Sequence, residues 1–436
     1  MNEQFINTDT ENLKTPRALL AGVSLSDSSE FENSMEELER LAEACGMEVA
    51  ARVVQNLSCP TAAYYMGSGK VEEIAETVKL LGIDHVIFED VLTPSQLKNL
   101  QKEIDAPIMD RTSLILEIFS RRAKTREARL QVESASLQYM LPRLVGMRES
   151  LGRQAGASGS MSNKGTGEKQ IELDRRKIEK RISELRRELE AIEHDRDVQR
   201  QKRFGSDLPQ VALVGYTNAG KSTLMNRLME TYGGREEKMV MAKDMLFATL
   251  DTTVRRISPG DKKDFLLSDT VGFISKLPHG LVKAFRSTLD EARYADLLLE
   301  VVDASDEHWR EQMQVTRQTL QELGAEKLPC IHVMNKADRI FPKEELPRVE
   351  GDKIYLSARD GAGLEELLGM INGIVYAGNR RAVFLLPYDR GGVVSYLNEN
   401  STVYSQEYLA EGVRLSVDCR ESDYARLAEY LEKEEA

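Results

Sequence analysis

Four short strings carry residues whose types and spacing fit a nucleotide pocket. They are G-Y-T-N-A-G-K-S at 215–222, D-T-V-G at 269–272, N-K-A-D at 335–338 and S-A at 357–358. The first matches the phosphate-binding pattern G-x-x-x-x-G-K-[ST]. Taken together and in this order, the four strings predict a pocket that accepts GTP and rejects ATP.

The first string has the neighbours that a phosphate-binding loop (P-loop) requires. The apolar run 211–214 predicts a buried strand before it, and 223–228 predicts a helix after it. Gly215 and Gly220 would let the backbone N–H groups and the helix N-terminus face the phosphates. Lys221 would reach the β- and γ-phosphates, and the Ser222 hydroxyl would hold Mg²⁺.

The second string predicts a sensor of the γ-phosphate. The run 265–268 is a predicted strand that delivers Asp269 to the outer shell of the metal. Gly272 would offer its N–H to the γ-phosphate, so that this segment responds to whether the phosphate is present.

The last two strings predict recognition of guanine. A strand over 329–334 would end at Asn335, and Asp338 would accept hydrogen bonds from N1–H and the exocyclic amine of guanine. Adenine lacks both donors, and an unpaired buried carboxylate is costly. Lys336 would lie under the base, and the backbone of 357–358 would cap the guanine O6 atom.

Bulk properties limit the class of protein. A chain of 436 residues predicts two to four domains, and its net charge is −13. We found no signal peptide and no apolar run of membrane-spanning length, so we expect a cytoplasmic protein. The cysteines form no C-x-x-C pair and the five histidines show no ligand spacing, which favours reduced structural thiols at Cys45, Cys59, Cys330 and Cys419.

One basic segment stands out in this acidic chain. Residues 121–203 carry 21 Lys and Arg against 13 Asp and Glu, a net charge of +8, which leaves −21 for the remainder. Such a segment is expected to meet a polyanion. The alternative is a solvated helix face with ion pairs four residues apart.

The patterns predict an α/β protein with a P-loop GTPase domain and three further parts. We expect a disordered tail (1–15), an N-terminal α/β domain with a mostly parallel sheet (16–110), a helical hairpin (111–206), the G domain (207–377) and a small α+β C-terminal domain (378–436). In the N-terminal domain, G-S-G-K at 67–70 lacks the P-loop spacing and predicts a turn that leads into a helix.

The hairpin is predicted from two helical arms, over 113–144 and 168–201. In the second arm apolar residues recur at steps of four and three, a seam that should face the first arm, at Ile178, Ile182, Leu185, Leu189 and Ile192. Between the arms, 146–167 holds six glycines, four serines and the basic residues Arg148, Arg153 and Lys164. A loop of this length is either a ligand-binding element or a flexible linker.

Several of these strings resemble the HflX family of ribosome-associated P-loop GTPases over nearly the whole chain. The N-terminal string at 64–74, the P-loop with Thr223, F-A-T-L-D at 247–251, D-T-V-G-F-I at 269–274 and L-P-Y-D-R-G at 386–391 are similar to segments of that family. The resemblance implies binding to the large ribosomal subunit, splitting or rescue of stalled ribosomes, and a hairpin whose loop points into the catalytic centre of the subunit.

The resemblance also implies functional residues. It makes 247–251 switch I, whose Thr249 would bind Mg²⁺, with Thr253 as the alternative. The expected catalytic residues are Lys221, Thr249 and Gly272, and the expected metal ligands are Ser222, Thr249 and Asp269. The expected GTP-binding residues are Gly215, Tyr216, Thr217, Asn218, Ala219, Gly220, Lys221, Ser222, Phe247, Ala248, Thr249, Leu250, Asp251, Asp269, Thr270, Val271, Gly272, Asn335, Lys336, Ala337, Asp338, Ser357, Ala358 and Arg359.

The chain departs from the family pattern at two places. The hairpin loop reads G-T-G-E at 165–168 where the family usually has G-P-G-E, and switch I continues D-T-T at 251–253 where the family usually has D-P-T. The loss of Pro frees the backbone at Thr166 and Thr252. A different loop shape or an altered trigger is the expected consequence.

The sequence thus predicts a monomeric, Mg²⁺-dependent GTP hydrolase that binds the 50S subunit and its rRNA, with no role for DNA or membrane insertion. Phe273 stands where many GTPases have the Gln that orients water, so the missing group should come from a partner. In the alternative, Phe273 packs in the core and another residue positions water. The rival functions are a GTPase that regulates a protein partner and a non-catalytic, GTP-gated RNA-binding module.

Overall fold

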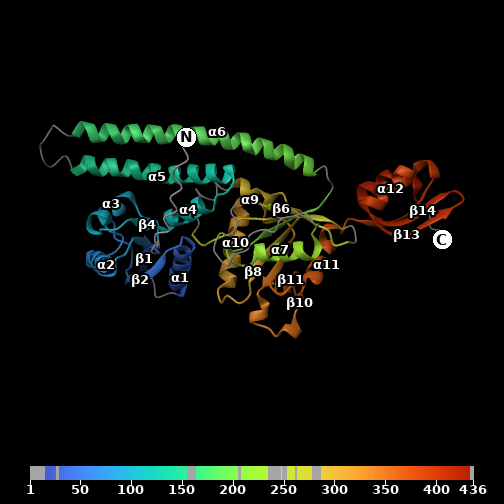
Figure 1. Cartoon of the computed structure of the whole chain (residues 1–436), viewed down its shortest axis with the longest axis horizontal. Coiled ribbons are helices and arrows are strands. Elements are labelled where there is room, and N and C mark those ends of the chain that lie inside the picture. The colour runs from blue at the N-terminus through green and yellow to red at the C-terminus, as the bar shows by residue number, and fades with distance from the viewer. Residues whose placement is uncertain are drawn as a thin grey trace, which may run out of the picture. The chain divides into compact units, whose positions relative to one another are not determined.

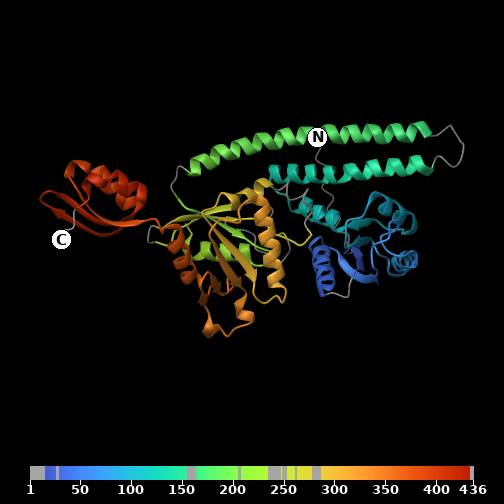
Figure 2. The ribbon, with the colours of Figure 1, turned by 180° about the vertical axis from the view of Figure 1, so that it is seen from behind.

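The computed structural model describes residues 15–25, 29–154, 164–204, 208–233, 247, 253–260, 263–276 and 286–432. The chain divides into two compact units, one from Met1 to Ile192 and the other beginning at Glu193. Figures 1 and 2 show their elements from opposite sides. The domain boundaries given above stay predictions.

The first unit contains a four-stranded parallel sheet, as its sequence predicts. The strand order is β2 (Glu48–Asn56), β1 (Arg17–Ser24), β3 (His85–Phe88) and β4 (Ile108–Asp110). Helices α2 (Ser68–Leu81) and α3 (Pro94–Glu103) share an apolar core with one face of the sheet. Helices α1 (Ser29–Ala44) and α4 (Arg111–Arg122) pack together beside it (Figure 1).

The G-S-G-K string of this unit is a helix start. Gly67 is extended and α2 begins at Ser68, so the predicted helix is confirmed, but the string itself forms no turn. The helix ends where Gly82 takes the left-handed conformation, with φ of 61°. Because a left-handed residue with a side chain is strained, glycine suits this end of the helix.

A buried carboxylate connects the middle of the first arm of the hairpin to this sheet. Asp110, at the end of β4, caps α4 by accepting a hydrogen bond from the Ser113 backbone at 2.9 Å and accepts another from the Leu92 backbone at 3.1 Å. It also accepts from the Tyr139 hydroxyl and pairs with Arg143, both on α5 (Arg126–Gln154). The first arm of the hairpin is therefore tied to the sheet through one side chain.

The arms of the hairpin differ from the prediction in their limits. The expected first arm is two helices, because the chain is extended at Ala123 and the Thr125 hydroxyl accepts a hydrogen bond from the Ala128 backbone at 3.2 Å to begin α5. The expected loop 146–167 is also too long: α5 continues to Gln154 and α6 spans Lys164–Phe204. A glycine within a helix costs about 1 kcal/mol of helix stability relative to alanine, and the good helix formers beside these glycines outweigh that cost.

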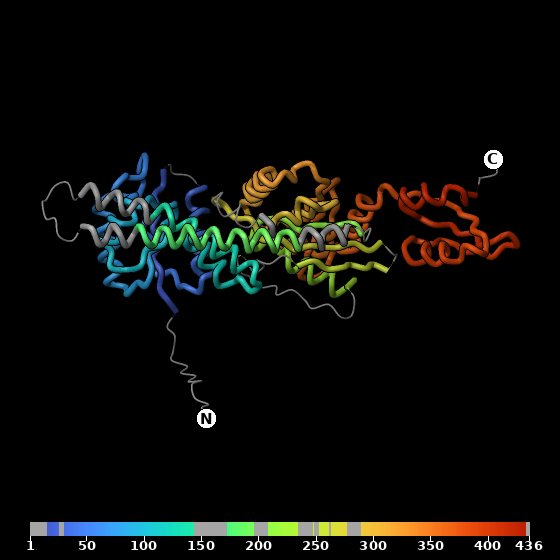
Figure 3. The backbone as a smooth tube through the Cα atoms, turned by 90° about the horizontal axis from the view of Figure 1, so that it is seen from above, coloured from blue at the N-terminus to red at the C-terminus, as the bar shows by residue number. Residues whose placement is uncertain are grey.

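The two arms run alongside each other (Figures 1 and 3). Leu185 of the predicted seam is fully buried, and the other four seam residues are half-buried. Arg181 contacts Glu133 at 2.7 Å and Arg126 contacts Glu188 at 2.7 Å, so ion pairs cross between the arms. The seam prediction is confirmed.

The second unit contains a seven-stranded sheet. Its order is β10 (Arg348–Glu350), β11 (Lys353–Tyr355), β9 (Cys330–Asn335), β8 (Leu297–Asp303), β5 (Gln210–Val214), β7 (Phe265–Asp269) and β6 (Thr253–Ile257). The inner strands are parallel and the two outer pairs are antiparallel. In such sheets ligands bind at the carboxyl ends of the parallel strands, which here are the ends of β5, β7, β8 and β9.

Helices cover this sheet on both faces. Helices α7 (Lys221–Tyr232) and α11 (Leu364–Val375) share one apolar core with the strands. On the other face α10 (Trp309–Leu323) packs beside α9 (Arg286–Arg293). Trp309 lies against Val302 and Met334 in a small apolar cluster.

The C-terminal residues form a third sheet with antiparallel order β12 (Arg380–Leu386), β14 (Gly412–Cys419) and β13 (Thr402–Leu409). Helix α12 (Gly391–Asn400) and the short α13 (Glu421–Arg426) contribute to its core. Helix α13 is followed by a 3₁₀ turn, Ala428–Tyr430. The α+β character predicted from the sequence is confirmed.

Candidate functional site

The P-loop joins β5 to α7, and close neighbours demand its two glycines. Gly215 has φ of 135°, and a Cβ atom there would lie 2.2 Å from the Val301 carbonyl oxygen. Gly220 has φ of 98°, and its Cβ would lie 2.2 Å from the Asn335 amide nitrogen. Any side chain at either position would push the loop off the neighbouring strands.

The P-loop lysine is held inside the loop. The Lys221 ammonium donates to the Gly215 and Tyr216 carbonyl oxygens at 3.0 and 2.8 Å. Burial lowers the pKa of Lys221 to about 8, and the charge of Asp269 partly opposes this. An anion bound beside the ammonium would favour its charged form.

Two of the three predicted metal ligands lie together. The Ser222 hydroxyl donates to the Asp269 carboxylate at 2.7 Å. Asp269 reaches this place because it ends β7, next to β5 in the sheet, where it is opposite Leu213. A hydroxyl and a carboxylate are oxygen donors of the kind that Mg²⁺ prefers, so the donor set fits this ion.

The predicted γ-phosphate sensor lies directly against the P-loop. The Phe273 backbone donates to the Gly215 carbonyl at 3.1 Å and accepts from the Thr217 backbone at 2.8 Å. A Cβ atom on Gly272 would lie 2.8 Å from the Thr217 side chain and 3.0 Å from the Lys221 ammonium. Glycine is therefore required where this segment meets the lysine.

Side chains add to this connection. The Tyr216 hydroxyl accepts a hydrogen bond from the Ser275 backbone at 2.7 Å and lies 2.5 Å from the Ser275 hydroxyl. Phe273 is 2% exposed, so its ring packs inside the protein, as the alternative interpretation of this position requires. We use the name switch II bridge for these contacts of 272–275 with 215–217.

The third and fourth strings meet the P-loop through one asparagine. The Asn335 side chain donates to the Ala219 carbonyl at 2.8 Å and accepts from the Ala358 backbone at 3.0 Å. Lys336 pairs with Asp303 at 2.7 Å. Asp338 is half-buried in a 3₁₀ turn, Ala337–Arg339, on this side of the sheet.

The structure does not describe every predicted site residue. Phe247 is buried, with φ of 54°, but Ala248, Thr249, Leu250 and Asp251 lie outside the described residues. The alternative ligand Thr253 begins β6, and its hydroxyl contacts the Met225 sulfur at 3.7 Å. The third metal ligand therefore stays a prediction.

Three residues near the pocket are absent from the predicted set. They are Asp303, which pairs with Lys336, Ser275 in the switch II bridge, and Arg227, which donates to the Arg359 carbonyl. Asp303 ends the strand beside Asn335, so strand-end position is a signal that could have found it. Ser275 and Arg227 depend on tertiary contacts that carry no local pattern.

Comparisons with known proteins agree with this arrangement. Three family profiles match the chain: GTP-binding GTPase N-terminal (32–120), GTP-binding GTPase Middle Region (122–203) and 50S ribosome-binding GTPase (210–336). The GTPase HflX of Lacrimispora saccharolytica is 40% identical over 414 residues, which are 95% of this chain and 96% of the relative. The GTPase HflX of Escherichia coli K12 is 38% identical over 410 residues, 93% of each chain.

The chain belongs to the HflX family of GTPases. Its fold is that of a P-loop GTPase and its enzyme class is GTP hydrolase, as the four strings predict. Among solved structures, a GTP-binding protein from Sulfolobus solfataricus in complex with GDP is 26% identical, with a TM-score of 0.43, and the match covers 82% of this chain and 98% of that one.

Two general expectations concern the whole chain. All four cysteines are free, as expected, and burial raises the pKa of the Cys45 and Cys419 thiols, which makes both poor nucleophiles. Among the helices that the structure describes, none is long and apolar enough to cross a membrane.

Asp338 gives the first prediction. Asp338→Asn should weaken GTP binding by at least about 100-fold, because two hydrogen bonds to a charged group are worth roughly 3 kcal/mol or more. The same variant should gain affinity for xanthosine triphosphate, whose base presents an acceptor to the new amide. Equilibrium binding of both nucleotides measures this, with Arg339→Gln as the control. Equal affinity of the wild-type protein for ATP and GTP would refute the assignment.

The switch II bridge gives the second prediction. Tyr216→Phe should leave the fold intact but remove the acceptor of the Ser275 N–H, at a cost of about 1.4 kcal/mol. Amide hydrogen exchange at 273–276 should then be about tenfold faster. Tyr232→Phe, at the end of helix α7, is the matched control. Unchanged exchange at 273–276 would show that the hydroxyl does not hold the segment.

Proposed function

We propose that this GTPase binds the large ribosomal subunit in its GTP-bound state, in the cytoplasm, and dissociates or rescues stalled ribosomes. The observation that carries the proposal is the match of 210–336 to the 50S ribosome-binding GTPase profile, in a chain that also has a basic helical hairpin. The pocket would supply the nucleotide dependence and the hairpin the contact with RNA.

The pocket is built so that the nucleotide controls switch II. Lys221 would bind the β- and γ-phosphates, and the Gly272 N–H would face the γ-phosphate. Because Gly272 lies beside Lys221, we expect a phosphate bound to this lysine to change the switch II bridge. GTP and GDP would therefore favour different positions of 272–275.

Mg²⁺ fits the same place. Ser222 would bind the ion directly, and Asp269 would act from its outer shell. Thr249 of switch I, or Thr253 in its place, would be the third protein residue at the ion. The ion would neutralise charge on the phosphates. The protein itself positions GTP through Lys221 and the P-loop backbone and selects guanine through Asp338.

The residue after Gly272 explains why a ribosome should matter for hydrolysis. Phe273 can neither donate nor accept a hydrogen bond through its side chain, and its ring is buried. We infer that a group of the ribosome orients the attacking water instead.

The distribution of charge along the hairpin supports a contact with RNA outside the middle of α6. Between Glu172 and Asp195 there are seven basic and eight acidic residues, and five of the basic residues form ion pairs, such as Arg175–Glu179 at 2.9 Å. The middle of α6 is thus a solvated, self-paired face, as the alternative interpretation stated. The net +8 resides elsewhere: +4 in 121–143, +2 in 144–171 and +3 in 196–203, against −1 in 172–195.

A charge comparison tests the RNA contact. Replacing Arg148, Arg153 and Lys164 by Gln should weaken co-sedimentation with 50S subunits in the presence of a GTP analogue. It should also reduce the salt dependence of binding by about two to three units of slope, since each lost phosphate contact removes about 0.7–0.9. Nucleotide affinity should not change.

The matched control neutralises Arg176, Lys177 and Lys180 in the self-paired middle of α6, where the same loss of charge should leave binding nearly unchanged. Replacing 146–167 by a short Gly/Ser turn should abolish action on ribosomes. If that variant acts on ribosomes as the wild type does, the segment is a linker. If the wild-type protein binds 50S subunits equally well with GDP and with the GTP analogue, the proposed dependence of binding on the nucleotide is wrong.

A further inference from the structure

Three side chains with metal-binding atoms lie on neighbouring strands of the seven-stranded sheet. Glu300 on β8 is directly opposite His332 on β9. Cys330 is two residues before His332, and alternate residues of a strand share a face. The sheet register therefore gathers a carboxylate, an imidazole and a thiol that sequence spacing does not connect.

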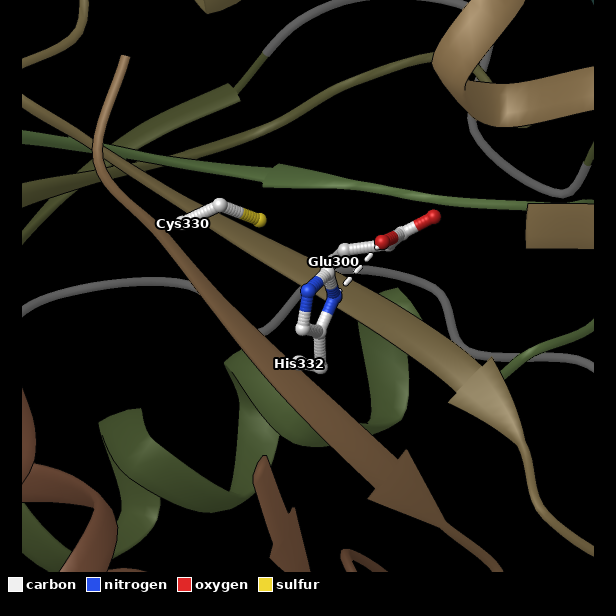
Figure 4. A group of neighbouring side chains, drawn as sticks. All are labelled: Glu300, Cys330 and His332. Atoms are coloured by element: carbon white, nitrogen blue, oxygen red, sulfur yellow. Dashed lines mark hydrogen bonds and ion pairs between the residues drawn. The ribbon is translucent and has the colours of Figure 1, made fainter. Parts of the chain in front are cut away.

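The three groups converge. The His332 Nδ1 atom lies 2.7 Å from a Glu300 carboxylate oxygen, and the ligand atoms of the three residues all lie within 4.8 Å of one another. Figure 4 shows the side chains pointing toward one another from the two strands. The Glu300 and His332 side chains are 7% and 16% exposed, so the group is largely screened from water but can be reached.

We propose that Glu300, Cys330 and His332 bind one Zn²⁺ ion. One sulfur, one nitrogen and one oxygen donor suit a borderline-soft ion that accepts all three in tetrahedral coordination. Mg²⁺ and Ca²⁺ take oxygen ligands, so this site differs in chemistry from the Ser222–Asp269 pair of the nucleotide pocket. Water would complete the coordination.

A second carboxylate, that of Asp352, lies beside the His332 ring. An Asp352 oxygen lies 3.7 Å from His332 Nε2, the nitrogen that does not face Glu300. The His332 backbone N–H donates to the Asp352 carbonyl at 2.9 Å, which holds this loop residue beside the ring. Metal-bound histidines commonly have a carboxylate at their second nitrogen, where it fixes the orientation of the ring.

The site lies on the strands that end at the guanine-recognition residues. Asp303 of β8 is opposite Asn335 of β9, three residues beyond the Glu300–His332 pair. An ion bound to both strands would fix their register near the pocket without taking part in hydrolysis. Because it binds the folded state, it would also stabilise the protein against unfolding.

The test uses the full-length protein after removal of metal by a chelator, with Co²⁺ as the spectroscopic probe and Zn²⁺ as its competitor. We expect one Co²⁺ per chain, with a thiolate-to-cobalt charge-transfer band that stoichiometric Zn²⁺ removes. Cys330→Ser should abolish the band, and Asp352→Asn should weaken Zn²⁺ binding by about tenfold. Cys419→Ser, a buried cysteine outside the group, should keep both the band and the affinity.

Binding of GDP to each variant shows that it is folded, and Glu300→Gln provides a second variant of the site if Cys330→Ser does not fold. Absence of a charge-transfer band in the wild-type protein would overturn the proposal, and Glu300–His332 would then be a buried ion pair only. A band that persists in Cys330→Ser would also overturn it, since the thiolate would come from another cysteine.

Discussion

The side chain of Asn335 is the contact on which the nucleotide pocket depends. Its amide joins the P-loop at Ala219 to the backbone of Ala358, across two strand ends. The closeness of this contact excludes a Cβ atom at position 220 and so requires glycine there. Contacts within the protein thus hold together three segments that are far apart in the sequence, and such preorganisation reduces the ordering cost of binding.

The switch II bridge is the second connection of the pocket. Two backbone hydrogen bonds and the Tyr216–Ser275 contacts hold 272–275 on the P-loop. Hydrogen bonds of this kind contribute about 1 kcal/mol each, so a phosphate with its own contacts to Lys221 and Gly272 can compete with them. In the proposed function, the Asn335 connection would keep the guanine end of the pocket fixed while the switch II bridge responds to the phosphates.

Much of this could be predicted from the sequence, because strand-end motifs and apolar runs are local signals. The P-loop, the strand that carries Asp269 and the helix after G-S-G-K lie where their residues predict. The hairpin was less predictable: a Thr125 cap divides the first arm, and helix formers carry α5 and α6 into the expected loop. Asp303, Ser275 and the Glu300–Cys330–His332 group come from sheet register and tertiary contact, which no local pattern encodes.

The central claim is that the large subunit completes a catalytic site in which Phe273 cannot orient water. The direct measurement is the GTPase rate of the purified protein with and without saturating 50S subunits. The account predicts slow hydrolysis alone and a large rise with 50S, toward the ~10³-fold or more that groups supplied by a partner give in P-loop GTPases. A rate that saturating 50S leaves unchanged, or fast hydrolysis by the isolated protein, would contradict it.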